Sequence, residues 1–96
     1  MQAGYRLRIS YRVAALVRGM HPRLKKKIKA SLERILLNPN EGKSLKDELA
    51  GLRSFRVGRF RIIYRIQKNH VEIVAIGPRE RIYEETFYLL RKDPQD

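Results

Sequence analysis

Apolar and polar positions follow two rhythms along the first half of the chain. From Tyr5 to Ile9 apolar residues alternate with arginines, the two-residue period of a half-buried strand. After Ser10, which can cap a helix, the apolar positions take up helical spacing. They predict a first helix with Val13, Leu16, Val17 and Met20 on its apolar face, and a second with Leu24, Ile28, Leu32 and Ile35. Pro22 suits the first turn of the second helix, and Asn38 to Asn40 would end it.

The second half of the chain predicts a strand meander followed by a helix. A polar connection, with a helical turn around 46–49, leads to strands over about 52–57, 60–67 and 71–76. Gly77 and Pro78 would end the third strand, and a last helix runs from about Glu80 to Arg91. The order β-α-α-β-β-β-α predicts one α+β domain over 1–96: a small, mostly antiparallel sheet, packed on one face by the N-terminal helical hairpin, with a C-terminal helix.

Strand periodicity also predicts where the arginines of the sheet lie. In the strand over 60–67, Arg61, Ile63 and Arg65 share the face opposite to Phe60, Ile62, Tyr64 and Ile66. The hairpin should cover the apolar face, so the other would stay uncovered and carry Arg61 and Arg65, with Ser54 and Arg56 beside Arg61. Arg79 follows the third strand. We therefore expect Arg56, Arg61 and Arg79 to meet at one end of the uncovered face, where guanidinium groups can bind phosphate.

Charge narrows the range of partners. Lys and Arg number 22 and Asp and Glu 10, for a formal net charge of +12, which exceeds the magnitude of about 2 to 8 that serves solubility. Such a field attracts polyanions, which can be nucleic acid, an acidic protein segment or anionic lipid. Cysteine is absent, the two histidines are far apart, and no apolar run suits a membrane span or a secretory signal. We expect a cytoplasmic protein that uses no metal, no small-molecule cofactor and no membrane.

Three stretches of the second half resemble one protein family. "RVGRFRIIYRI" (Arg56 to Ile66) is similar to the hairpin pattern R-V-G-x-Y/F-R-I-I-Y of the RelE/ParE superfamily of toxins from type II toxin–antitoxin modules. "LAGLRSFRVG" (Leu49 to Gly58) resembles its L-x-G-x-x-x-x-R-V-G lead-in, and "IGPRERIYEE" (Ile76 to Glu85) its G-x-R-x-x-x-Y ending. The expected order of elements matches this fold over nearly the whole chain.

The resemblance implies a toxin with one of two targets. RelE-like members are ribosome-dependent endoribonucleases that cleave mRNA in the ribosomal A site without a metal, whereas ParE-like members poison DNA gyrase. A cognate antitoxin neutralises both. RelE-like members often have a tyrosine near the C-terminus in the site, and ParE-like members generally lack it. Arg79 followed by Tyr83 therefore favours the nuclease branch. We expect an mRNA endoribonuclease that inhibits translation, with an acidic antitoxin, the ribosome and mRNA as partners. The alternatives are a gyrase inhibitor and a degenerate toxin that binds RNA without cleaving it.

The RelE-like pattern implies a catalytic set made of Arg56, Arg61, Arg79 and Tyr83. Arg61 and Arg79 would stabilise the phosphorane-like transition state, and Tyr83 would act as a base if Arg56 and Arg79 favour its phenolate. Ser54 stands where the pattern often has a second basic residue, and Tyr88 is an alternative to Tyr83. The general base and acid therefore stay open. Further basic residues are expected to contact RNA or the ribosome: Arg53, Arg59, Arg65, Arg81, Lys25, Lys26 and Lys29.

Overall fold

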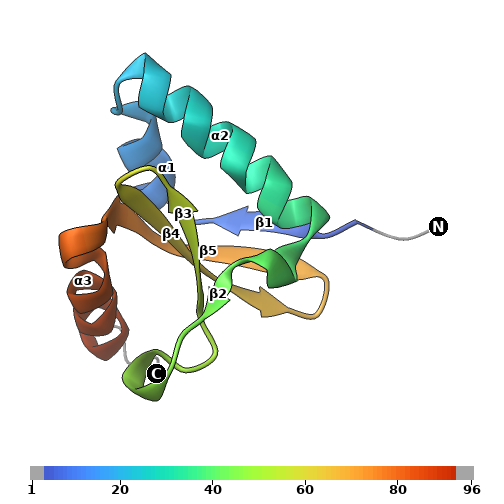
Figure 1. Cartoon of the computed structure of the whole chain (residues 1–96), viewed down its shortest axis with the longest axis vertical. Coiled ribbons are helices and arrows are strands. Elements are labelled where there is room, and N and C mark those ends of the chain that lie inside the picture. Colours follow the sequence, from blue (N-terminus) through green and yellow to red (C-terminus); the bar gives the residue numbers. More distant parts are fainter. Residues whose placement is uncertain (1–3, 93–96) are drawn as a thin grey trace.

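A mixed sheet of five strands lies at the centre of the computed structural model, which describes residues 4–92 (Figure 1). The strands are β1 (Arg6–Ile9), β2 (Lys43–Ser44), β3 (Arg53–Val57), β4 (Phe60–Gln67) and β5 (His70–Pro78), in the spatial order β1-β5-β4-β3-β2. The predicted antiparallel meander is β3, β4 and β5, and β1 pairs with β5 in parallel. Strand β2 was not predicted: it has two residues, too few to show a period.

Two helices form the predicted N-terminal hairpin, α1 (Tyr11–Arg18) and α2 (Pro22–Leu37). The Ser10 hydroxyl accepts a hydrogen bond from the Val13 N–H at 3.1 Å, which confirms the predicted cap. Helix α1 buries Val13 and Val17, whereas Leu16, expected on the same face, is 44% exposed and lines a surface hollow between α1 and α3. Two 3₁₀ turns follow, η1 (Pro39–Glu41) and η2 (Asp47–Leu49), the latter at the predicted helical turn.

The main core lies between the hairpin and one face of the sheet. Residues of both layers are buried there, among them Val13, Ile28, Ile35, Ile62, Tyr64 and Val71. Tyr64, fully buried, donates a hydrogen bond to the Pro39 carbonyl at 2.6 Å and accepts one from the Gly42 N–H at 3.1 Å. The core thereby holds the connection that leads into β2.

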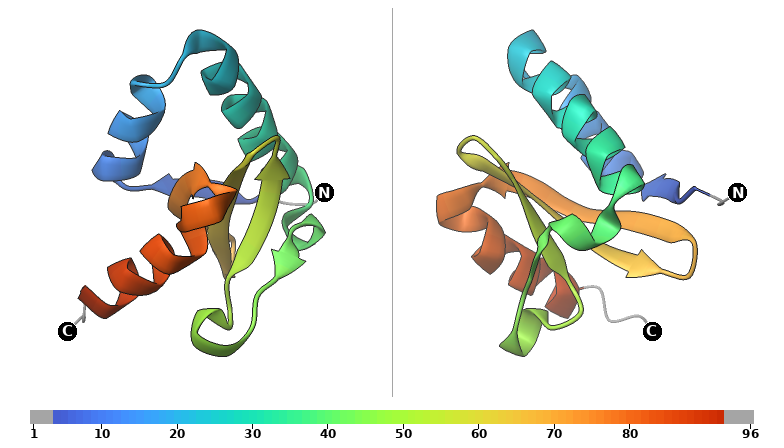
Figure 2. Two further views of the ribbon diagram at one scale, coloured as in Figure 1. Left: turned by 60° about the vertical axis from the view of Figure 1, so that its left-hand side comes forward. Right: turned by 45° about the vertical axis from the view of Figure 1, so that its right-hand side comes forward.

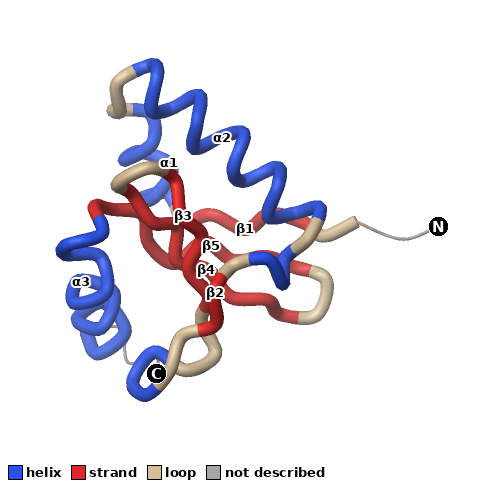
Figure 3. The backbone as a smooth tube through the Cα atoms, in the orientation of Figure 1, coloured by secondary structure: helices blue, strands red, loops and turns tan. Residues whose placement is uncertain are grey.

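The opposite face of the sheet is not bare, so the expectation of an uncovered face was wrong. Helix α3 (Arg79–Lys92) packs on it, and Figures 2 and 3 show the sheet between α3 on one side and the hairpin on the other. A second apolar cluster is buried there, made of Leu52, Ile63, Ala75 and Ile82. The reason is that Ile63 and Ala75 form an apolar patch on this face, which the amphipathic helix α3 covers.

A β-bulge in the β4–β5 pair helps to form this second cluster. Ile63 pairs with Ala75 and Tyr64 with Ile73, so Val74 has no partner across the strands. Val74 and Ala75 both contribute to the α3 side, while Ile73 and Ile76 face the hairpin. Strand β5 also runs two residues beyond its predicted end, because Arg61 and Phe60 pair with Gly77 and Pro78. In the part of the chain that the structure describes, no helix is long and apolar enough to cross a membrane.

Candidate functional site

Arg56 and Arg61 lie directly opposite one another across β3 and β4. Residues in this relation point to the same face, and like charges so placed destabilise a sheet by about 0.2–1 kcal/mol. The tight turn that brings them together passes through Gly58, whose φ of +60° favours glycine. The local sequence therefore builds a pair of repelling cations at the end of the hairpin.

Arg79 joins this pair from the start of α3. Its backbone N–H donates a 2.8 Å hydrogen bond to the carbonyl of Arg59, which ties the first turn of α3 to the β3–β4 turn. Arg56, Arg59, Arg61 and Arg79 line one hollow of about 280 Å³, together with Gly58 and Glu80. The structure thus brings Arg56, Arg61 and Arg79 to one place, on the α3 side of the sheet beyond the buried cluster.

The Arg61 side chain has an unused hydrogen-bond donor. Its Nε is buried and has no hydrogen-bond partner among the described residues. The neighbour of Arg61 on β5 is Gly77, which has no side chain to offer one. A buried, unpaired donor of a cation is unfavourable, and an anion in the hollow would satisfy it. This geometry is suited to binding an oxyanion.

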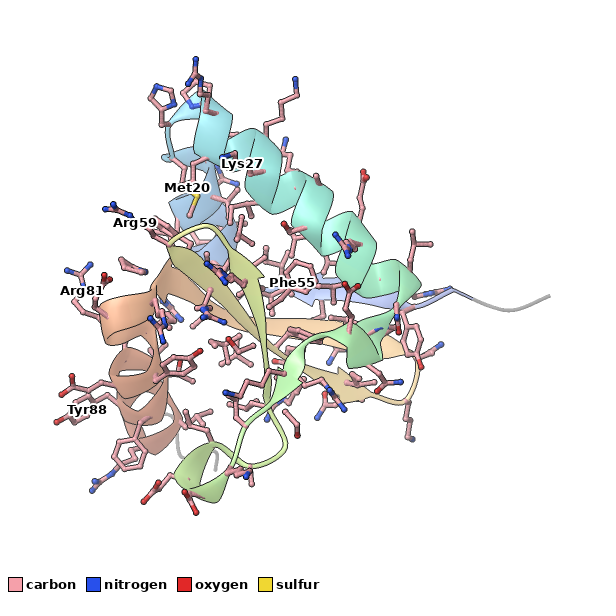
Figure 4. The ribbon with its side chains drawn as sticks, in the orientation of Figure 1. Met20, Lys27, Phe55, Arg59, Arg81 and Tyr88 are labelled. Carbon is pink, nitrogen blue, oxygen red and sulfur yellow. The ribbon has the colours of Figure 1, made fainter. Side chains whose placement is uncertain are left out.

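A second hollow of about 490 Å³ adjoins the first, because Arg56 and Arg61 line both. Its remaining walls come from α2, the η1–β2 connection and β3, namely Ala30, Ser31, Arg34, Glu41, Gly42, Lys43, Ser54 and Phe55. Arg34 is bound to Glu41, with Nη2–Oε2 at 2.6 Å, and its guanidinium lies 5.9 Å from the centre of the Phe55 ring. Figure 4 shows Phe55 between the sheet and α2.

Tyr83, on α3, is hydrogen-bonded to Ser54, which lines the second hollow. The two hydroxyl oxygens are 3.0 Å apart, and Ser54 is 2% exposed. Tyr83 also packs against the second cluster, and it does not line the hollow of Arg79. Tyr88, the alternative, is 55% exposed, packs edge-to-face with Phe87 and lines neither hollow. Of the two tyrosines, Tyr83 is therefore the one beside the cations.

The other arginines of the expected interface lie in different surroundings. Arg53 faces the hairpin side and donates hydrogen bonds to the carbonyls of Gly42 and Asn40 at 2.6 and 3.2 Å. Arg65 is paired with Glu72 at 2.8 Å, four residues along β4 from Arg61. Arg59 lines the first hollow, while Arg81 is 3.5 Å from Glu85; Figure 4 shows both at the edge of the molecule where α3 begins. Of these four arginines, only Arg59 lines the hollow that Arg56, Arg61 and Arg79 line.

The lysines expected to bind RNA lie along α2. Lys26 and Lys29 are exposed and Lys25 is half-buried. Lys29 lines a groove with Leu7, Val17 and other residues of β1 and the hairpin. None of the three lines either arginine hollow, so they form a basic surface of their own.

Sequence reasoning missed two cations beside the site, Arg34 and Lys43. Arg34 is one of several cations on α2, and its position in the helical period does not distinguish it from the others. Lys43 lies in a stretch that reads as a polar connection, because β2 is too short to be periodic. The position of Lys43 beside Ser54 could be predicted only from the pairing of β2 with β3. Among residues 4–92, no group of three or more His, Cys, Asp or Glu could hold a metal ion.

Comparison with solved structures places this fold among toxins. A chain of the toxin–antitoxin complex RelBE2 from Mycobacterium tuberculosis is 27% identical, with a TM-score of 0.70 over 80% of this chain and 100% of that one. A mutant of the Escherichia coli toxin RelE in the free state is 16% identical, with a TM-score of 0.76 over 97% and 100%. The YoeB–YefM complex from Staphylococcus aureus matches at 23% identity and 0.63, over 77% and 95%. The last two likenesses show the fold alone.

The sequence itself matches a family model. No curated protein matches the chain. Residues 16–83 match the family described as the ParE toxin of the type II toxin–antitoxin system parDE. That match spans well over half of the 96 residues. The protein therefore belongs to the ParE toxin family of type II toxin–antitoxin systems, within the RelE/ParE superfamily.

Proposed function

We propose that this toxin is an endoribonuclease that cleaves mRNA on the ribosome and so inhibits translation. One observation carries the proposal: Arg56, Arg61 and Arg79, from three elements, line one hollow next to the Ser54–Tyr83 pair. Guanidinium groups bind phosphate oxygens through paired N–H donors, and the Arg61 Nε has no partner among the described residues. A phosphodiester is the ligand that this set of donors fits best.

The chemistry required is attack by a ribose 2′-oxygen on the adjacent phosphorus, with departure of the 5′-oxygen. Negative charge then grows on the non-bridging oxygens, where Arg61 and Arg79 donate hydrogen bonds. Removing one such donor typically costs about 2.7–4 kcal/mol of transition-state stabilisation. Tyr83, with its hydroxyl 3.0 Å from Ser54 Oγ, is oriented by a partner that can donate or accept. It is the group on α3 that takes part in proton transfer from the 2′-hydroxyl.

The ribosome would position the substrate, which the isolated toxin does not do by itself. Arginines keep their protons at neutral pH, so they bind phosphate well but transfer protons poorly. Holding the substrate in a reactive geometry can lower a barrier by about 7–11 kcal/mol, which an mRNA fixed on the ribosome would gain. Lys25, Lys26 and Lys29 on α2 offer a basic surface for rRNA phosphates.

A second candidate function is inhibition of DNA gyrase. The observation that favours it is the family model, which describes ParE toxins. In this case the arginine hollow would bind an acidic protein surface or DNA, and Tyr83 would serve packing only. Its signature in cells is DNA damage with intact message.

Expression in a bacterial host separates the two functions. We would induce the wild type, Arg79→Ala and, as a control, Arg91→Ala, which removes the same charge at the far end of α3. Nuclease activity predicts growth arrest with truncated mRNA for the wild type and for Arg91→Ala, and none for Arg79→Ala. Arrest with a DNA-damage response and full-length mRNA would overturn the proposal in favour of gyrase inhibition. Absence of toxicity in all three would overturn both.

The proposed protein partner is a cognate acidic antitoxin. Support comes from the net charge of +12 and from neighbours that are toxin–antitoxin complexes. A bound acidic chain would relieve the repulsion among the arginines and raise stability by mass action. We expect the protein encoded by a small adjacent reading frame to co-purify with this chain and raise its Tm. A toxin that stays monomeric and whose Tm does not change when that protein is added would contradict the expectation.

A further inference from the structure

Lys43 is placed beside the arginine site by the pairing of β2 with β3. It lies directly opposite Ser54 in the antiparallel register, so both side chains point to the same face. Residues in this relation have Cβ atoms about 4.5–5.5 Å apart. Ser54 is the hydrogen-bond partner of Tyr83, and Lys43 lines the same hollow as Ser54, Arg56 and Arg61. The lysine therefore lies beside Ser54, on the edge strand of the sheet, and lines the hollow that Arg56 and Arg61 also line.

The backbone at Lys43 is held from the opposite side of the sheet. Gly42, just before it, donates its N–H to the Tyr64 hydroxyl and accepts a 2.6 Å hydrogen bond from Arg53 at its carbonyl. A Cβ at Gly42 would lie 2.4 Å from the Tyr64 hydroxyl oxygen, so the two residues are in close contact. These contacts fix the start of β2, although it has only two residues. Lys43 thus projects from an anchored position.

The charges around Lys43 leave its ammonium group free. Besides Lys43, the charged residues that line the second hollow are Arg34, Glu41, Arg56 and Arg61. Glu41 is the one carboxylate among them, and both of its oxygens are hydrogen-bonded to Arg34, at 3.2 and 2.6 Å. Within residues 4–92 Lys43 has no ion-pair partner. An anion in the hollow would be its natural ligand.

Lysine differs from the surrounding arginines in its chemistry. An ammonium group can bind phosphate and can also give up a proton, whereas a guanidinium group cannot be deprotonated in a protein. The hollow therefore holds three arginines, which can only bind charge, and one lysine, which can transfer a proton.

We propose that Lys43 is a catalytic residue that donates a proton to the leaving 5′-oxygen. This inference rests on the proposed RNA cleavage. The bond between the 2′-oxygen and phosphorus forms, and the bond between phosphorus and the 5′-oxygen breaks. The 2′-hydroxyl proton passes through the Tyr83 hydroxyl to a solvent water, the 5′-oxygen takes the Lys43 proton, and the amine is reprotonated from water. The products are a 2′,3′-cyclic phosphate and a 5′-hydroxyl.

The test compares two mRNAs in ribosome complexes under single-turnover conditions. One has the normal 5′-oxygen at the cleavage site, and the other has sulfur in its place, a leaving group that departs without a proton. The enzymes are the wild type, Lys43→Met, Lys43→Arg and the control Lys46→Met. Lys46 is an exposed lysine three residues away that lines neither arginine hollow. Equal Tm values show that the variants are folded.

Proton donation predicts a specific pattern of rates. Lys43→Met should cleave the oxygen substrate about 10²–10⁴-fold more slowly, the range of general acid catalysis. Lys43→Arg should be equally slow, and both should approach the wild type on the sulfur substrate. Equal losses on both substrates, recovery by arginine, or no loss at all would overturn the role of Lys43. A wild type that cuts neither RNA would instead overturn the proposed nuclease function and this inference with it.

Discussion

Replacing Tyr64 with phenylalanine tests how the fold holds the edge of the site. The phenol donates to the Pro39 carbonyl at 2.6 Å and accepts from the Gly42 N–H at 3.1 Å. Tyr64, Pro39 and Gly42 are all buried, so Tyr64→Phe leaves two buried backbone groups without a partner. Each unsatisfied group costs about 1–3 kcal/mol, which gives a loss of about 2–6 kcal/mol in the free energy of unfolding.

Urea and thermal unfolding measure this loss directly. In a domain of this size each kcal/mol lowers the Tm by about 4–8 °C, so we expect a fall of at least about 8 °C. The control is Tyr11→Phe, because Tyr11 is 81% exposed and should show no change. A loss below about 1 kcal/mol for Tyr64→Phe would refute the reasoning, since it would mean that neither backbone group depends on the phenol.

The pH dependence of the same pair of proteins provides a second check. Burial raises the pKa of Tyr64, against the opposing effects of the Gly42 N–H and the charge of Arg53. The folded state thus favours the neutral phenol, whose stabilising contribution is complete below the unfolded pKa of about 10 and is lost as the pH rises through the folded pKa. The stability difference between wild type and Tyr64→Phe should therefore shrink above about pH 10. A constant or growing difference in urea unfolding would contradict this.

Three further substitutions test individual contacts. Ile82→Ala should lower the free energy of unfolding by about 2–5 kcal/mol in urea titration, because Ile82 is 1% exposed and anchors α3 to the sheet; an unchanged midpoint would show that α3 does not depend on this contact. Gly42→Ala should also lower the Tm, because its Cβ would lie 2.4 Å from the Tyr64 hydroxyl oxygen, and equal stability would mean that the β2 connection yields freely. Ser10→Ala should cost about 1 kcal/mol through the lost α1 cap, measured by thermal unfolding, whereas Ser10→Thr should retain most of it.

Local pattern determined much of the fold in advance. Alternation and helical spacing predicted the N-terminal hairpin, the meander and the C-terminal helix, and all three are present. The same alternation placed Arg56 and Arg61 on one face of the meander, where they pair directly. The physical reason is that the side of an element on which a residue lies depends on backbone geometry, which the sequence shows at short range.

The tertiary structure decided which elements meet. Sequence could not show that α3 covers the second face, that a bulge sends Val74 and Ala75 to that face, or that Tyr83 reaches Ser54. It also could not place Lys43, because a two-residue strand has no period and its position depends on contacts to Tyr64 and Arg53 across the sheet. Periodicity describes one segment at a time, whereas a site assembled from β2, β3, β4 and α3 exists only after long-range packing has brought those segments together.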